Sequence, residues 1–101
     1  MTINVTENED AKEVTIHVSG RFDFSLHQSF MDAYQKYPKG EKKFVVDLGG
    51  AEYMDSSAMG MLLQLREHAA KDEGNIALVN PNETVRKILE IANFSKLFDV
   101  A

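Results

Sequence analysis

Cysteine is absent from the sequence, proline occurs only twice, and no apolar run is long. Without cysteine, a disulfide scaffold, a cysteine-ligated zinc and thiol chemistry are excluded, which fits a reducing compartment. The longest apolar stretch, residues 58–63, is far shorter than the roughly 20 residues that cross a bilayer. The first residues carry neither a basic region nor an apolar run, so we expect no signal peptide and a cytoplasmic setting.

Positive charge is also scarce. Eleven Lys and Arg against sixteen Asp and Glu give a net charge of −5. Nucleic acids and anionic membrane surfaces attract basic proteins, so we expect neither of them as a partner. The 101 residues are enough for one hydrophobic core that folds without a metal, which predicts a single domain over residues 1–101.

Hydrophobic periodicity predicts an α/β fold. Alternating residues indicate strands at 3–6 and 14–19, joined by an acidic loop, and short apolar runs at 44–48 and 76–79 are typical of buried strands. Apolar residues at helical spacing predict three helices, at 25–38, at about 56–71 and from 80 onward. The order β-β-α-β-α-β-α, with an apolar tail at 94–100, predicts one mixed sheet of four to five strands with helices mainly on one face.

The connections between the predicted strands and helices indicate how the strands pair and where the helices begin and end. We expect the first two strands to pair antiparallel and the strands at 44–48 and 76–79 to be parallel neighbours, because a helix connects them. Ser25 followed by Gln28 is a capping-box pattern, so Ser25 is expected to cap the first helix, which Pro38 ends. Gly49–Gly50 is expected to break the strand at 44–48, and Asn80–Pro81 to start the third helix.

Signatures of catalysis and metal binding are missing. The Gly-x-Ser-x-Gly pattern of serine hydrolases is absent, and spacing gives His17, His27 and His68 no catalytic partner. No His pair at helical spacing, calcium loop or phosphate-binding glycine loop occurs, and the first strands end without the acidic pair that a receiver domain needs for Mg²⁺. We therefore expect no enzyme, no cofactor and no metal.

One segment, residues 53–63, is unusual. Asp55, Ser56 and Ser57 cluster where a helix begins, which is more than capping alone requires. Met59 and Leu63 lie outside the arc of core-facing positions on that helix; they either widen the buried stripe or form an apolar contact surface. A phosphate on a first-turn serine would be favoured by the helix dipole and would add a charge of about −1.5 to −2 to such a surface.

The segment Met54-Asp55-Ser56-Ser57-Ala58-Met59-Gly60 resembles the Asp-Ser-Ser-Gly motif of the STAS domain family, specifically its single-domain anti-sigma factor antagonists. Residues 18–23, 44–48 and 78–98 resemble other segments of that family in the same order, so the resemblance covers essentially the whole chain. Ala58 departs from the pattern, which usually has Gly there; Ala is the better helix former.

The resemblance implies a protein-binding switch in a bacterial cell. By this resemblance, Ser57 would accept the phosphate, and Asp23, Asp55 and Ser56 would be the residues that support this phosphorylation site. The unphosphorylated domain, a monomer when free, would bind an anti-sigma factor that is also a serine kinase, and phosphorylation would release it. A PP2C-type serine phosphatase would restore binding. The expected partner-binding residues are Phe22, Phe24, Met59, Gly60 and Leu63.

Two other functions stay open. The domain could be a STAS module without phosphorylation, serving as a scaffold or nucleotide-sensing part of a larger signalling complex. It could also be a small hydrolase that uses Ser57 with one of the histidines.

Overall fold

The computed structural model describes residues 2–8, 12–37, 43–69 and 76–100. These residues form a sheet of five strands in the spatial order β1-β2-β3-β4-β5, with three α-helices and two short 3-10 helices. The strands are β1 (Thr2–Asn8), β2 (Glu13–Phe22), β3 (Lys43–Met54), β4 (Ile76–Val79) and β5 (Asp99–Val100). The helices are η1 (Phe24–Leu26), α1 (His27–Gln35), α2 (Ser56–His68), α3 (Glu83–Ile91) and η2 (Phe94–Lys96).

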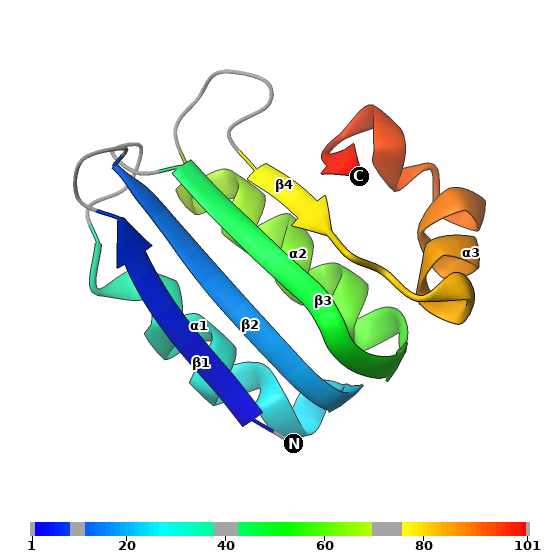
Figure 1. Cartoon of the computed structure of the whole chain (residues 1–101), viewed down its shortest axis with the longest axis horizontal. Coiled ribbons are helices and arrows are strands. Elements are labelled where there is room, and N and C mark those ends of the chain that lie inside the picture. The colour runs from blue at the N-terminus through cyan, green and yellow to red at the C-terminus, as the bar shows by residue number, and fades with distance from the viewer. Residues whose placement is uncertain (1, 9–11, 38–42, 70–75, 101) are drawn as a thin grey trace.

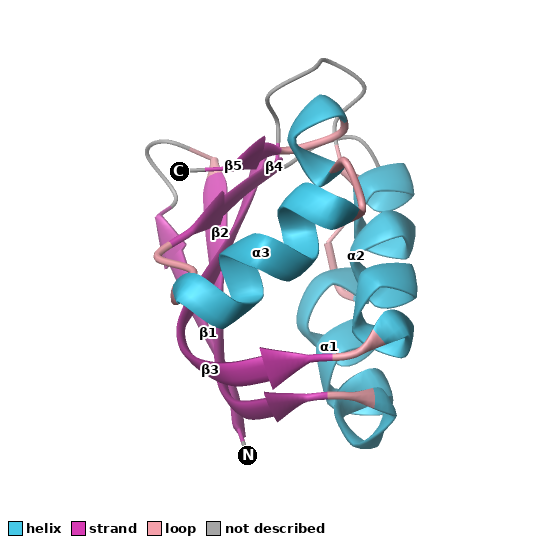
Figure 2. Ribbon diagram, turned by 90° about the vertical axis from the view of Figure 1, so that its right-hand side faces the viewer, coloured by secondary structure: helices cyan, strands magenta, loops and turns pink. Residues whose placement is uncertain are grey.

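The sheet is mixed, as expected. β1 pairs antiparallel with β2, whereas β2–β3, β3–β4 and β4–β5 are parallel pairs. Helices α1 and α2 lie side by side on one face of the sheet, whereas α3 follows β4 and packs against β3 (Figures 1 and 2). The expected α/β class and the helices mainly on one face are therefore confirmed. No helix in the described ranges has the length and apolarity needed to span a bilayer.

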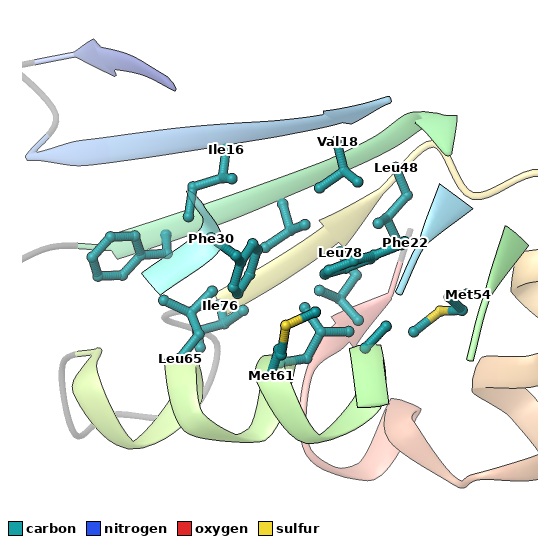
Figure 3. Close-up of a cluster of buried hydrophobic side chains, with 14 of the residues drawn as sticks. Ile16, Val18, Phe22, Phe30, Leu48, Met54, Met61, Leu65, Ile76 and Leu78 are labelled. Atoms are coloured by element: carbon teal, nitrogen blue, oxygen red, sulfur yellow. The ribbon is translucent and has the colours of Figure 1, made fainter. Parts of the chain in front are cut away.

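The hydrophobic core fills the space between the sheet and the helices α1 and α2. Every second residue is buried over the first six residues of β2 and of β3, and Figure 3 shows such side chains pointing toward α2. Phe30 of α1 and Leu65 of α2 are fully buried against them. The residues between these positions stay partly exposed because they face away from the helices.

The expectation that Gly49–Gly50 would end a strand is wrong, because β3 continues to Met54. The glycines accompany a register shift instead: His17 lies opposite Asp47, but Ser19 lies opposite Gly50. A Cβ atom at Gly50 would come within 3.0 Å of the Val18 carbonyl oxygen and 2.9 Å of the Ser19 hydroxyl. Glycine therefore permits a bulge that bends β3 without interrupting it.

The expected helix boundaries need correction at several points. Ser25 does not cap α1: it lies within η1, whose N-cap is Asp23. Helix α3 begins at Glu83 with Asn82 as its cap, after the expected start at Asn80–Pro81. Helix α2 begins at Ser56 as expected and ends at His68, while Pro38 and Lys71 lie outside the described residues. The apolar tail forms both η2 and the edge strand β5.

Candidate functional site

The carboxyl ends of β2 and β3 bring two turns together. Phe22 and Met54 are register partners at these ends. The backbone N–H of Asp55 donates to the carbonyl oxygen of Phe22 at 3.3 Å, which joins the turn after β2 to the start of α2. Parallel neighbours end at the same edge of a sheet, so the turn after β2 lies beside the start of α2.

Asp55 caps helix α2. Its backbone is extended, and its Oδ1 accepts a hydrogen bond from the Ala58 N–H at 3.0 Å. The same oxygen accepts the Ser57 hydroxyl at 2.6 Å. The Ser57 hydroxyl lowers the pKa of Asp55 most, the Ala58 N–H lowers it further, and partial burial opposes both effects. Asp55 is therefore an ionised cap at neutral pH, held by donors that favour its charge.

The two serines of the segment differ in their environment. The Ser57 side chain is half-buried and its hydroxyl proton points to Asp55, whereas Ser56 is exposed. Fixing the proton leaves the oxygen lone pairs of Ser57 free to face an incoming electrophile. The first-turn N–H groups of α2 favour an anion at this position. The geometry therefore suits Ser57 to accept a phosphoryl group.

A second turn with the same arrangement lies beside the first. Asp23 Oδ1 accepts the Ser25 N–H at 2.9 Å and also the Ser25 hydroxyl. Its half-buried carboxylate holds the turn between β2 and α1, next to Asp55. Asp23 therefore shapes the turn after β2, which lies beside the start of α2.

The expected partner-binding residues fall into two groups. Phe24 is 66% exposed and stacks on His27, with ring centroids 4.9 Å apart; Leu63 is 40% exposed, and Gly60 is exposed as well. Met59 is half-buried and packs against the core. We call Phe24, Met59, Gly60 and Leu63 the contact surface.

Phe22 does not belong to the contact surface, which corrects the expectation for this residue. Its side chain is fully buried and packs on Phe30, with ring centroids 5.3 Å apart (Figure 3). A signal for this was present in the sequence: Phe22 continues the alternation of Val14, Ile16 and Val18. Only its carbonyl oxygen takes part in the site.

A cation that no sequence motif indicates lies beside the site. The Arg21 guanidinium carbon lies 5.4 Å from the ring centroid of Tyr53, which is 40% exposed. The two residues are register partners just before the turns that carry Asp23 and Asp55. Their pairing depends on the register shift in β2 and β3, which no sequence pattern indicates.

His27 stacks on Phe24 of the contact surface, whereas His17 and His68 contact other parts of the molecule. His17 Nδ1 lies 3.0 Å from Asp47 Oδ2, and its Nε2 lies 3.3 Å from the Thr6 hydroxyl, on the sheet face opposite α1 and α2. His68 donates to the Tyr37 carbonyl oxygen at 2.7 Å. Ser57 donates to a carboxylate rather than to a histidine, so the geometry gives no support to a hydrolase built on Ser57.

Metal and small-molecule sites are poorly supported. The described ranges contain no group of three or more His, Asp or Glu residues that could hold a metal ion. A shallow hollow of about 310 Å³ lies between α1 and α2, lined by Tyr34, Gln64 and His68 among others. It lies at the opposite end of α2 from Ser57 and is separate from the contact surface.

Comparisons with known proteins find relatives that match nearly the whole chain. A family model described as "Mlab, STAS domain" matches residues 5–99. The chain is 48% identical to a STAS-domain containing protein of Pseudomonas aeruginosa over 101 residues, which is 100% of both chains. It is 31% identical over 89 residues to a protein of Thermotoga neapolitana whose name describes it as a "putative anti-sigma factor antagonist"; the match covers 88% of this chain and 74% of the relative.

Solved structures share the fold. A crystal structure of a "putative anti-sigma factor antagonist" from Thermotoga maritima superimposes with a TM-score of 0.79 at 18% identity, over 97% of this chain and 84% of the other. The anti-sigma factor antagonist SpoIIAA in its unphosphorylated form gives a TM-score of 0.66 at 21% identity, over 99% and 88% of the two chains. The phosphorylated form of the Bacillus cell fate determinant SpoIIAA gives 0.61 at 20% identity, over 99% and 91%.

Proposed function

The chain belongs to the STAS domain family, and on that premise we propose that it is an anti-sigma factor antagonist switched by phosphorylation of Ser57. Unphosphorylated, it binds an anti-sigma factor that is also a serine kinase. Phosphorylated, it releases that partner, and a PP2C-type serine phosphatase restores binding. It works in the bacterial cytoplasm as a ligand and substrate, not as a catalyst.

The hydrogen bond between Ser57 and Asp55 carries this proposal. A kinase transfers a phosphoryl group to an oxygen atom that must be presented in line with the leaving group. Asp55 holds the Ser57 hydroxyl in one orientation, at 2.6 Å, on the first turn of a helix that tolerates negative charge. Ser56 is exposed and lies on the same turn, but no such hydrogen bond orients it toward Asp55.

The contact surface supports binding of a protein partner beside the acceptor. Phe24 and Leu63 expose apolar area on elements next to Ser57, and exposed aromatic residues are frequent binding anchors. Nothing lies within 4 Å of the position that a Cβ atom of Gly60 would take, so a partner can approach the α2 backbone there. A phosphate among these residues would repel an acidic partner surface, and it would lose its hydration if it were buried against an apolar one.

The test begins with the protein from its native cell. Mass spectrometry should find phosphate on Ser57. Immobilised Ser57→Ala protein should bind a kinase, and immobilised Ser57→Asp protein should not. With ATP, the bound kinase should phosphorylate the wild-type chain and leave Ser57→Ala unmodified. If both variants bind the kinase equally and phosphate never occurs on Ser57, the proposal is wrong. A STAS module without phosphorylation would then be the better description.

A further inference from the structure

We infer that phosphorylation of Ser57 expels the carboxylate of Asp55 from the N-cap of α2, so that the switch rebuilds the helix start in addition to changing surface charge. The inference rests on the proposed function, because it takes Ser57 as the acceptor. It concerns what the phosphate does inside this chain, before any partner is involved.

Phosphoryl transfer removes the donor that Asp55 depends on. The Ser57 oxygen forms a bond to the γ-phosphorus of ATP, the bond from that phosphorus to ADP breaks, and the hydroxyl proton leaves with the kinase's base. The oxygen that donated to Asp55 at 2.6 Å then carries no proton and bears a group of charge about −1.5 to −2. An attractive contact becomes a repulsion between like charges.

The phosphate also competes for the helix cap itself. Ala58 N–H donates to Asp55 at 3.0 Å in the unmodified chain. Phosphate oxygens are strong acceptors of backbone N–H groups at a helix N-terminus, so they can replace the carboxylate there. Both groups cannot occupy the cap at once, and the one with more charge is favoured.

The surroundings leave the Asp55 side chain as the part that moves. The backbone of Asp55 is fixed on both sides, because its N–H donates to Phe22 and its carbonyl oxygen accepts from Met59 at 3.3 Å. The neighbouring carboxylate of Asp23 binds Ser25 and adds a further negative charge to this edge. The Asp55 carboxylate, already half-exposed, therefore turns toward solvent beside the contact surface.

The experiment compares phosphoserine in two backgrounds. Phosphoserine is inserted at position 57 during translation, in the wild-type chain and in Asp55→Asn, because Asn caps a helix as well as Asp but carries no charge. Thermal unfolding of the four proteins measures the coupling. We expect phosphoserine to destabilise the wild-type chain more than Asp55→Asn, by about tenfold in the unfolding equilibrium constant. An equal effect in both backgrounds would show that Asp55 is not involved.

A second measurement follows the carboxylate directly. In the unmodified chain the Ser57 hydroxyl is the main cause of the low pKa of Asp55. Titration of the Asp55 side-chain carbon by NMR should therefore show a higher pKa when phosphoserine occupies position 57. Phosphoserine at the exposed Ser56 is the matched control, because it adds the same charge one residue away and leaves the Ser57 hydroxyl in place as a donor. It should raise the pKa of Asp55 less than phosphoserine at position 57 does. An unchanged or lower pKa with phosphoserine at 57 would overturn the inference.

The same proteins separate this inference from the proposed function. Loss of kinase binding by the phosphoserine-57 protein, with no coupling to Asp55, would leave the function standing and remove the inference. Coupling to Asp55 with kinase binding retained would support the inference and contradict the proposed function. Both effects together, coupling and loss of binding, are the result we expect.

Discussion

The Ser57 hydroxyl donates to Asp55, the residue that caps the helix on which Ser57 lies. One carboxylate therefore orients the proposed phospho-acceptor and caps the start of the helix. This connects the chemistry of the site to the stability of α2, and it makes the contributions of Asp55 separable by substitution. Asn preserves the cap and removes the charge, while Ala removes both.

Asp55→Ala should destabilise the fold by about 0.5–2 kcal/mol, the usual cost of losing an N-cap. The Ala58 N–H and the Ser57 hydroxyl both lose their acceptor in this variant. Asp55→Asn should stay within a few tenths of a kcal/mol of the wild type. Urea unfolding of the three proteins measures the difference, and an Ala variant as stable as the Asn variant would show that the cap contributes nothing.

Asp47 should make stability depend on pH in the acid range. The Gly49 N–H lowers its pKa most, Asn80 and His17 lower it further, and burial opposes them. A folded-state pKa below the unfolded value of about 3.9 stabilises the fold at higher pH, and this contribution disappears as pH falls through the lowered pKa. The stabilisation is complete above about pH 5 and is lost progressively as pH falls from the unfolded pKa of about 3.9 toward the lowered folded-state pKa.

Asp47→Asn tests this dependence. The variant should show a shallower decline of the unfolding midpoint between about pH 6 and pH 2 than the wild type does. Asp32→Asn, which changes an exposed carboxylate on α1, is a matched control that should retain the wild-type slope. Equal slopes for the wild type and Asp47→Asn would rule out Asp47 as a source of the acid sensitivity.

Local patterns in the sequence predicted part of the fold well. Helix α2 begins at Ser56 and β4 spans residues 76–79, because caps and apolar runs act over a few residues. The glycine pair at 49–50 was misjudged, since its bulge depends on the close approach of Val18 and Ser19 from another strand. Ser25 does not cap α1, because the 3-10 helix η1, with Asp23 as its N-cap, precedes α1. Side-chain partners across strands, such as Arg21 and Tyr53, depend on register, which only the folded chain reveals.

The glycines at 50 and 60 should respond oppositely to substitution by Ala. A Cβ atom at Gly50 would approach backbone at 3.0 Å, so β2 or β3 must shift, and we expect a loss of about 1–3 kcal/mol. Gly60 lies within α2 with open space around it, and Ala there should stabilise the helix by up to about 1 kcal/mol. Chemical denaturation of both variants checks the pair; similar effects at the two positions would contradict the described bulge.

Substitution of Phe22 by Ala should mainly reduce stability, whereas substitution of Phe24 by Ala should mainly weaken partner binding. Phe22 is fully buried, so Phe22→Ala should cost about 3–5 kcal/mol of stability. Phe24 is 66% exposed, so Phe24→Ala should change stability little while weakening binding of the kinase that Ser57→Ala retains. Thermal unfolding and equilibrium binding are measured for both proteins, and Leu63→Ala serves as a second probe of the contact surface. If Phe24→Ala and Leu63→Ala both bind the kinase as tightly as the wild type, the partner does not dock on the contact surface, because these two side chains are its most exposed apolar groups.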